Sequence, residues 1–305
     1  MSMSNIFGEF GLAYRLVAGM SSIYLHLPIR PGYSLLRKAN RTYRAWYSKS
    51  QAKQRQRIVT ANVDGINYEL DLIELIDSSL YHRGCFEPHT TATITKYVQP
   101  GMTALDVGAN IGCHTLRLAR LVGETGRVIA FEPTPWGFAK LQKNISLNES
   151  HNITLEKLAL SDSNGDDSVF LRSSWHLDGT TGDEGKKPVT FIRLDDYVSQ
   201  MGLTQIDFIK LDVDGYESRV LRGALATISR FRPMIIVECS TKPDAVNANV
   251  VDTIDTLDSL GYGFYSERKL KKYKSKDALF HSVLKNSSEN IVAFPADGRC
   301  RLLRK

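Results

Sequence analysis

Apolar and polar runs alternate along this chain in a way that predicts strands and helices in turn from about residue 81 onward. Short apolar runs typical of buried strands occur at residues 103–107, 127–131, 153–157, 206–211, 233–238, 262–265 and 291–294. Apolar positions three or four residues apart predict helices at residues 89–98, 111–121, 136–148 and 245–260. Strands that alternate with helices indicate a mostly parallel sheet covered by helices on both faces.

The chain before this region has a different character. Residues 1–57 combine apolar side chains at helical spacing with a run of arginines and lysines. We expect a basic helical extension that packs on the core or makes a homodimer contact, and the alternative is an arm that docks on a membrane surface, a partner subunit or an acidic substrate. Residues 58–80 then place Asp64 and Gly65 between two strand-like runs, which predicts a β-hairpin and a lead-in to the core.

Composition narrows the class of protein. The 305 residues are 42% hydrophobic and 24% charged, which suffices for one α/β domain with a sizeable core and an appendage. The net charge of +6 predicts only weak attraction to anionic partners. The four cysteines are scattered and fit free thiols in a reducing compartment. No basic residue precedes the first apolar run, so we expect no secretory signal and a cytoplasmic protein.

The stretch at residues 103–115 carries the main chemical signal. It reads as a buried strand that contains Asp106, followed by a turn between Gly108 and Gly112 and then a helix. Glycine lacks the Cβ that would keep a ligand away from the backbone, and a helix N-terminus presents free N–H groups. The arrangement is typical of a nucleotide cradle.

The spacing of the acids indicates which nucleotide would bind. A dinucleotide site has the pattern G-x-G-x-x-G, whereas this turn reads D-V-G-A-N-I-G, with Asp106 before the glycines. A carboxylate there suits a cationic ligand, and Glu132 at the end of the next strand could accept hydrogen bonds from ribose hydroxyls. The ligand that fits is S-adenosylmethionine. The alternative is an ordinary strand–turn–helix unit with structural glycines.

Four segments together resemble the FkbM family of S-adenosylmethionine-dependent methyltransferases. They are L-D-V-G-A-N-I-G-C-H-T at 105–115, F-E-P at 131–133, A-L-S-D at 159–162 and D-F-I-K-L-D-V-D-G-Y-E at 207–217. The resemblance covers about residues 81 to 294. It implies a Rossmann-like class I methyltransferase fold with a mostly parallel seven-stranded sheet. It also implies O-methylation, often of sugars or natural products. On this basis residues 58–305 form the methyltransferase domain, with the catalytic core at 81–298 and a basic tail at 299–305.

Candidate cofactor-binding residues come from the cradle and from the resemblance. They are Glu87, Asp106, Gly108, Asn110, Gly112, Thr115, Glu132, Asp162 and Asp212. The resemblance implies that Glu87 lies beside the cofactor and that Asp162 accepts a hydrogen bond from the adenine amino group. The alternatives are that Glu87 caps the helix after it and that Asp162 is a turn residue.

A second group of acids follows the strand at residues 206–211. Ligands of a parallel sheet lie at the carboxyl ends of its strands, so Asp212, Asp214 and Glu217 are expected to converge beside the methyl donor as catalytic residues. Asp212 is the first candidate for the base that removes a hydroxyl proton or for a group that positions the acceptor, with Asp214 and Glu217 supporting it. The carboxylates could instead hold Mg²⁺ or another divalent cation, or Glu217 and Asp214 could simply shape the turn. The family usually carries Glu in place of Asp214.

We therefore expect an enzyme that methylates a hydroxyl or carboxyl oxygen of a sugar, glycan or natural product. An alternative is an RNA-binding or RNA-modifying protein that uses the basic N- and C-terminal segments. Base methylation is disfavoured, because residues 212–215 lack the Asn/Asp-Pro-Pro-aromatic pattern. A third hypothesis is a non-catalytic scaffold that keeps the cofactor pocket.

Two further stretches carry weaker predictions. The polar segment at residues 173–187 is a candidate substrate lid with Trp175 and His176 at its tip, or else a surface loop. The basic run at residues 267–276 is expected to be a solvated loop, with stacking on sugars or bases as the alternative.

Overall fold

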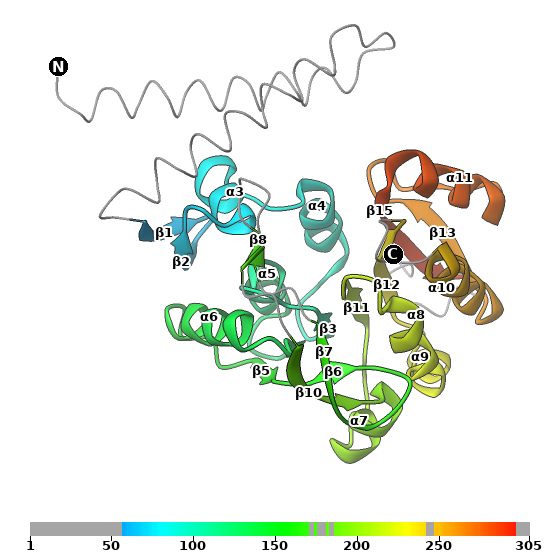
Figure 1. The fold of residues 1–305 in the computed structure, drawn as a ribbon, viewed down its shortest axis with the longest axis horizontal. Helices are drawn as coiled ribbons and strands as arrows, with labels where there is room; N and C mark the ends of the chain where they lie inside the picture. The colour runs from blue at the N-terminus through cyan, green and yellow to red at the C-terminus, as the bar shows by residue number, and fades with distance from the viewer. Residues whose placement is uncertain (1–56, 171–173, 176–180, 183–185, 242–246, 297–305) are drawn as a thin grey trace, which may run out of the picture. The chain divides into compact units, whose positions relative to one another are not determined.

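The computed structural model describes residues 57–170, 174–175, 181–182, 186–241 and 247–296. The chain divides into two compact units, one made of residues 1–86 and 172–184 and the other of residues 87–171 and 185–305 (Figure 1). The expected helical extension before Arg57, the basic tail at 299–305 and His176 lie outside the described residues. The division into a methyltransferase domain with these appendages stays a prediction.

The described part of the first unit is built on a hairpin. Its elements are β1 (Ile58–Val63), β2 (Ile66–Asp71), α3 (Leu75–Arg83), β8 (Ser174–Trp175) and β9 (Thr181–Gly182). Strands β1 and β2 are antiparallel, and Asp64 and Gly65 both have the positive φ that a tight hairpin turn needs. The predicted hairpin is confirmed. The polar segment at 173–187 is not a plain loop, because β8 and β9 pair within it. No alternation of apolar and polar residues in this segment predicts these two-residue strands.

The second unit contains the central sheet. Its eight strands lie in the order β14-β13-β15-β12-β11-β3-β4-β5. Their bounds are β3 (Thr103–Val107), β4 (Arg127–Phe131), β5 (Ile153–Glu156), β11 (Phe208–Leu211), β12 (Met234–Ser240), β13 (Tyr262–Ser266), β14 (Lys271–Lys272) and β15 (Ser288–Pro295). The five strands from β5 to β12 are parallel, and β15 runs antiparallel to both of its neighbours. The α/β Rossmann-like architecture is confirmed, and the short β14 is the strand beyond the seven expected.

A smaller sheet and eight helices complete this unit. The three strands β6 (Ala159–Leu160), β7 (Gly165–Phe170) and β10 (Lys186–Ile192) form the small sheet. The helices in the described residues of the unit are α4 (Pro88–Tyr97), α5 (Cys113–Val122), α6 (Pro135–Ser146), α7 (Leu194–Gln200), α8 (Glu217–Arg222), α9 (Leu225–Phe231), α10 (Asn247–Ser259) and α11 (Lys276–Asn286).

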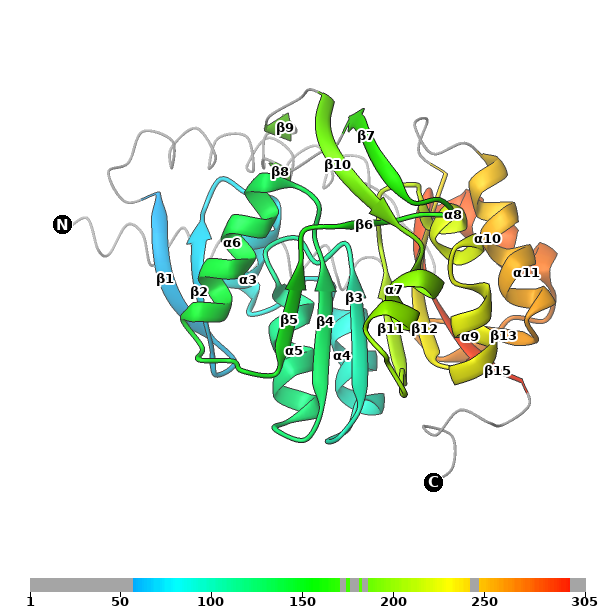
Figure 2. The same cartoon turned by 90° about the horizontal axis from the view of Figure 1, so that it is seen from below.

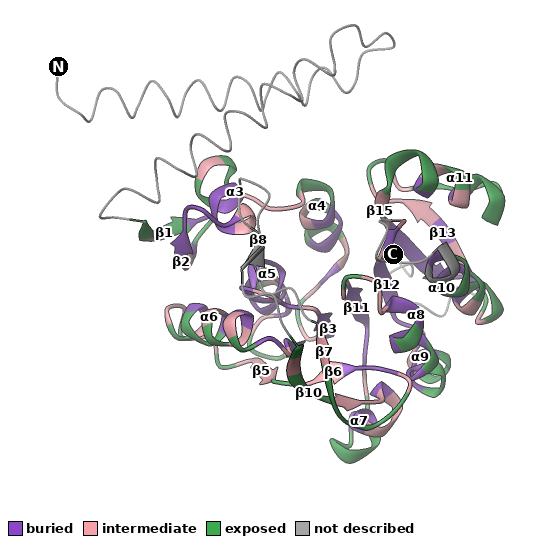
Figure 3. Cartoon of the chain, viewed as in Figure 1, coloured by how far each residue is buried: buried purple, intermediate pink, exposed green. Residues whose placement is uncertain are grey.

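Successive residues of a strand point to opposite faces of the sheet and pack in two separate hydrophobic clusters, one on each face. On β3, Ala104 packs in a cluster with Ile94 of α4 and Leu118 of α5. The next residue, Leu105, belongs to a cluster on the opposite face that includes Leu221 of α8. Figure 2 shows α7 and α9 in front of the sheet and α4 and α5 behind it. The strands are therefore buried on both sides (Figure 3), and each such leucine or isoleucine contributes about 1.5–3 kcal/mol.

The structure of residues 267–276 differs from the solvated loop that we expected for this basic run. It is not a solvated loop throughout, because Lys271 and Lys272 form β14 and pair with β13. Lys276 begins α11, and its ammonium group lies 2.7 Å from Asp255 and 3.2 Å from Asp258. Carboxylates on a helix far away in the sequence neutralise this lysine, which a local charge pattern could not reveal.

Two expectations about cysteines and membranes can also be compared with the structure. Cys85, Cys113 and Cys239 are free thiols, as expected. No helix in the described ranges is both long and apolar enough to cross a membrane.

Candidate functional site

One row of residues crosses the sheet and marks where the site lies. Strand pairing places in register Phe131 of β4, Val107 of β3, Leu211 of β11, Val237 of β12, Ile291 of β15 and Ser266 of β13. Six strands run in this one direction. The residues after the row on β4, β3, β11, β12 and β13 are Glu132, Gly108, Asp212, Glu238 and Glu267, and β5, whose Glu156 pairs with Phe131, is followed by Lys157. Four of the six are acids. The expectation that the tips of β3 and β11 lie together is confirmed.

A glycine makes the contact between these two tips feasible. Gly108 has φ +84°, and a Cβ added there would lie 1.8 Å from the carbonyl oxygen of Asp212. Gly112, at φ +88°, has no room either, since a Cβ would lie 2.3 Å from a side-chain methyl of Leu141. Gly108 therefore lets the β3–α5 turn pack against the backbone that follows β11, and Gly112 lets it pack against the Leu141 side chain of α6.

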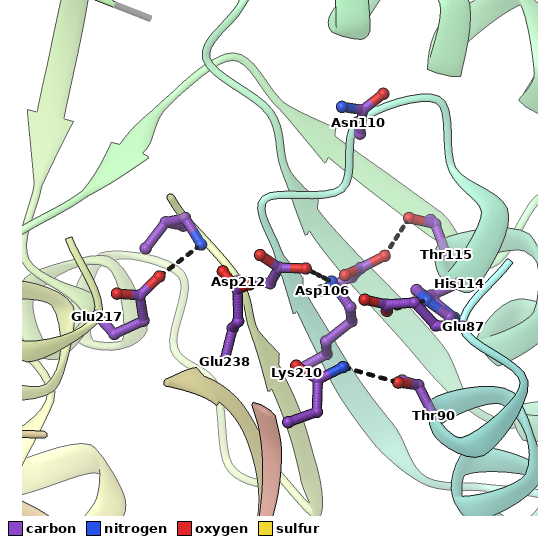
Figure 4. Close-up of polar contacts among 12 residues, drawn as sticks. Glu87, Thr90, Asp106, Asn110, His114, Thr115, Lys210, Asp212, Glu217 and Glu238 are labelled. Atoms are coloured by element: carbon purple, nitrogen blue, oxygen red, sulfur yellow. Dashed lines mark hydrogen bonds and ion pairs between the residues drawn. The ribbon is translucent and has the colours of Figure 1, made fainter. Parts of the chain in front are cut away.

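Asp106 is the most informative carboxylate in this turn. Its side chain is 1% exposed, and its Oδ2 accepts a hydrogen bond of 2.6 Å from the hydroxyl of Thr115 (Figure 4). Its Oδ1 has no hydrogen-bond donor among the described residues. A buried carboxylate oxygen without a donor is costly, so this atom indicates a place for a ligand's donor.

Glu132 holds the turn from the neighbouring strand. Its Oε2 accepts from the backbone N–H of Asn110 at 2.7 Å, and its Oε1 accepts from the backbone N–H of Thr134 at 2.8 Å and from the Thr134 hydroxyl. Asn110 has φ +50°, and its own side chain accepts from the N–H of Ile111. Burial raises the pKa of Glu132 despite these hydrogen bonds. The expected contact of Glu132 with ribose stays a prediction. Each carboxylate oxygen can accept more than one hydrogen bond, so Glu132 could bind the ribose hydroxyls in addition to the turn.

Lys210 is a buried cation that the sequence analysis did not single out. It is the register partner of Asp106, is 4% exposed, and its Nζ lies 3.0 Å from Oδ2 of Asp212. Burial alone would lower its pKa, but the charges of Asp212, Asp106 and Glu87 outweigh burial and raise it. Lys210 is therefore charged and lies among three carboxylates. A lysine inside an otherwise apolar strand was the signal available in the sequence.

The other two acids after β11 have different surroundings from Asp212. Oε1 of the buried Glu217 accepts from the backbone N–H groups of Val213 and Gly215, at 3.0 and 3.1 Å. Burial raises the pKa of Glu217. Asp214 is exposed, with φ +52°. These contacts support the alternative that Glu217 and Asp214 shape the turn that presents Asp212, and their catalytic role stays a prediction.

Asp162 lies at the start of the β6–β7 connection and is bound by two arginines of α8. Its Oδ1 accepts from Nε of Arg219 at 2.9 Å, and its Oδ2 accepts from Nη2 of Arg222 at 3.0 Å. Partial burial opposes the shift, but these hydrogen bonds lower the pKa of Asp162. The carboxylate stays ionised, and its expected bond to adenine stays a prediction.

Glu87 pairs with a histidine that the sequence analysis also passed over. Its Oε2 lies 3.0 Å from Nε2 of His114, whose side chain is buried on α5. Burial opposes the charged form of both groups. The His114 hydrogen bond and the Lys210 charge nevertheless lower the pKa of Glu87 to about 2. Cys113 and Glu87 raise the pKa of His114 to about 10. The pair is therefore ionic at neutral pH and fixes the chain just before α4.

Replacing Glu87 by glutamine should make stability depend on pH in a characteristic way. Because folding raises the pKa of His114 and lowers that of Glu87, the pair contributes its full stability between about pH 4.5 and 6.5 and loses it as pH rises through about 10. Glu87→Gln should lower the free energy of unfolding by about 3 kcal/mol at pH 6 and by less at pH 9.5. Thermal melts of both proteins across this range test the expectation, with the exposed Glu124→Gln as control. A difference in melting temperature that stays constant from pH 6 to 9.5 would contradict it.

The divalent cation considered from the sequence finds no support. In the described part of the chain, no three His, Cys, Asp or Glu side chains are grouped so that they could hold a metal ion.

Comparisons of the sequence with known proteins show the family of this chain. A family model described as a methyltransferase FkbM domain matches residues 106–264. The 2-O-methyltransferase NoeI of Sinorhizobium fredii is 30% identical over 156 residues, which are 44% of this chain and 62% of that protein. The hexuronic acid methyltransferase AglP of Haloferax volcanii is 35% identical over 120 residues, 39% of this chain and 48% of that protein. The matched part thus spans less than two thirds of either relative.

Among solved structures, a methyltransferase FkbM from Methylobacillus flagellatus is similar over 86% of this chain and 60% of its own. It is 16% identical, with a TM-score of 0.39.

Proposed function

Because the chain belongs to the FkbM methyltransferase family, we propose that it transfers the methyl group of S-adenosylmethionine to an oxygen atom of a small-molecule or glycan acceptor. The names of the relatives support this, since one is a 2-O-methyltransferase and another acts on a hexuronic acid. The observation that carries the proposal is the buried Oδ1 of Asp106, which has no donor among the described residues and lies just before the glycine turn between β3 and α5.

The residues present fit this cofactor. The methionine part of S-adenosylmethionine carries an ammonium group, which would supply the donor that Asp106 Oδ1 lacks. Gly108 and Gly112 let the turn pack closely against Asp212 and Leu141, which holds the turn beside the Asp106 carboxylate. Thr115 and Asn110 hold the carboxylate and the turn in place, and Glu132 and Asp162 are the proposed partners of ribose and adenine. The cofactor supplies a methyl group on a positively charged sulfur.

The chain's own side chains prepare the acceptor side. Lys210 binds Asp212 and fixes the direction of its carboxylate. Glu217 holds the backbone of the turn behind Asp212 through two N–H groups. We assign to Asp212 the positioning of the acceptor beside the methyl group, to Glu217 and Asp214 the support of that turn, and to Glu87 the support of α4 through His114. Preorganised groups of this kind lower the barrier by holding the reacting atoms in line.

A mass-spectrometric screen tests the proposal. Purified protein would be incubated with S-adenosylmethionine and a panel of neutral glycosides, uronic acid glycosides and hydroxylated polyketides. We expect one panel member to gain one methyl group on oxygen, and we expect the heat-unfolded protein to transfer none. A folded protein that binds no S-adenosylmethionine and methylates no panel member would contradict the proposal.

The RNA hypothesis draws on basic segments that lie mostly outside the described residues, and the name of AglP points to a hexuronic acid as substrate. A cytoplasmic location and a homodimer stay predictions.

A further inference from the structure

Glu238 is a carboxylate of the candidate site to which no role is assigned above. It lies on β12, where it is partly exposed and every other residue is buried. Its Oε1 accepts a hydrogen bond of 2.6 Å from the hydroxyl of Ser288 on β15. Along β12, Glu238 is therefore the residue that a ligand can contact.

Glu238 and Asp212 stand at the ends of neighbouring strands (Figure 4). Leu211 of β11 is the register partner of Val237 of β12, and Asp212 and Glu238 are the residues that follow them. The two acids are thus about one strand spacing apart, or about 4.8 Å between backbones. A single small molecule can contact both carboxylates.

The side chains of the two acids lie on the same face of the sheet. Lys210 and Ile236 are register partners, and Glu238 comes two residues after Ile236, so these three side chains share a face. Asp212 reaches that face because its Oδ2 lies 3.0 Å from Nζ of Lys210. Asp106 is the partner of Lys210 on the other neighbouring strand, and its buried Oδ1 lacks a donor in the described part of the chain. This face therefore needs a ligand with hydrogen-bond donors.

Two positive charges on this side of the sheet are already paired. Lys210 binds Asp212, and Nε2 of His114 lies 3.0 Å from Oε2 of Glu87. The carboxyl groups that share these two cations are those of Glu87, Asp106, Asp212 and Glu238. S-adenosylmethionine adds one net positive charge when bound, so these carboxyl groups still outnumber the positive charges. An anionic acceptor would be repelled, and the repulsion is strong where protein partly replaces water.

The order of the strands places the acceptor on the Glu238 side of Asp212. The proposed cofactor residues Asp106 and Glu132 belong to β3 and to the end of β4, and β12 adjoins β11 on the opposite side. A molecule that Asp212 holds beside the methyl group thus has the cofactor on its β3 side and extends over β12. Glu238 is the partly exposed residue that it meets there.

We propose that Glu238 determines acceptor specificity together with Asp212, by selecting a neutral acceptor whose hydroxyl groups bind both carboxylates. This inference rests on the proposed function and names a neutral sugar or another polyol as the substrate class. Ionised carboxyl oxygens accept hydrogen bonds and donate none, so two hydroxyls of one molecule satisfy both groups. A carboxylate or phosphate of an acceptor would offer them no donor and would add a like charge.

The test measures transfer to matched acceptor pairs, the methyl glycosides of glucose, galactose and mannose and the corresponding methyl glycosiduronates. Methyl ethers and methyl esters are counted together. We expect wild type to prefer the neutral member of each pair that it methylates by at least about tenfold in kcat/KM. Glu238→Gln keeps an oxygen for the Ser288 hydroxyl but removes the charge, and it should reduce this preference by about tenfold.

Glu289→Gln is the matched control. Glu289 also accepts from a hydroxyl, that of Tyr273, but its register partner is Cys239, so it lies on the opposite face of the sheet from Glu238. This variant should keep the wild-type preference. S-adenosylhomocysteine should bind wild type and both variants with the same affinity, because none of these changes touches a proposed cofactor residue.

The outcomes separate this inference from the proposed function. Absence of S-adenosylhomocysteine binding to folded wild type would overturn the proposed function itself. With binding intact, the inference alone is overturned by equal or faster transfer to the glycosiduronates, by a preference that Glu238→Gln leaves unchanged, or by no transfer to any neutral glycoside. The wild-type comparison needs no variant, so it tests the inference even if Glu238→Gln does not fold.

Discussion

Asp106→Asn is expected to weaken the binding of S-adenosylhomocysteine by about 100- to 1,000-fold, or about 3–4 kcal/mol. The carboxylate is 1% exposed, and one of its oxygens has no donor among the described residues. An asparagine keeps the volume but removes the negative charge and places either an amide N–H₂ or a weaker acceptor opposite the ligand's ammonium group. Thr115 would still have an oxygen or an amide beside it, so the fold should survive.

Isothermal titration of both proteins with S-adenosylhomocysteine measures the effect. The matched control is Asp207→Asn, since Asp207 is also buried but accepts from the N–H of Thr103 at the opposite end of the neighbouring strand. It should leave the affinity unchanged. Equal affinities for wild type and Asp106→Asn would show that Oδ1 of Asp106 has no part in binding the ligand.

Lys210→Met is expected to cost about 3–5 kcal/mol of folding stability. The methionine fills the aliphatic space, but the charges of Asp106, Asp212 and Glu87 lose the cation that compensates them. Because the pKa of Lys210 is raised when folded, its contribution is complete at pH 7 and below its ordinary pKa. The loss should be large at pH 7. It should be smaller near pH 4, because the carboxylates take up protons more readily in the variant without the cation, and this relieves their repulsion.

Denaturant unfolding at these two pH values provides the measurement. Lys143→Met replaces an exposed lysine of α6 and should leave the midpoint unchanged. If Lys210→Met unfolds at the wild-type denaturant concentration at pH 7, the three carboxylates are not held by this lysine.

The parts of the site that sequence reasoning predicted are those set by local pattern. A buried strand followed by a glycine turn and a helix determines that Asp106, Gly108 and Gly112 lie together, because no distant contact is needed to form that unit. Strands β3 and β11 pair in parallel, so the residues after them, Gly108 and Asp212, lie in contact. This follows from the sequence pattern, which places both residues at the carboxyl ends of their strands.

The residues that were missed depend on contacts between distant segments. Lys210 and His114 looked like interruptions of apolar patterns, and their importance comes from partners on other elements. Glu238 ends an apolar run, and only the pairing of β12 with β11 places it beside Asp212. Asp162 is bound by Arg219 and Arg222, which local sequence could not show.

The measurement that tests the central claim most directly is a calorimetric titration of the folded wild-type protein with S-adenosylhomocysteine. If the turn after β3 and the tip of β11 hold this nucleoside, one molecule should bind per chain with a dissociation constant in the micromolar range, about −8 kcal/mol. A protein that unfolds cooperatively yet shows neither binding heat nor a ligand-dependent rise in melting temperature would contradict the account.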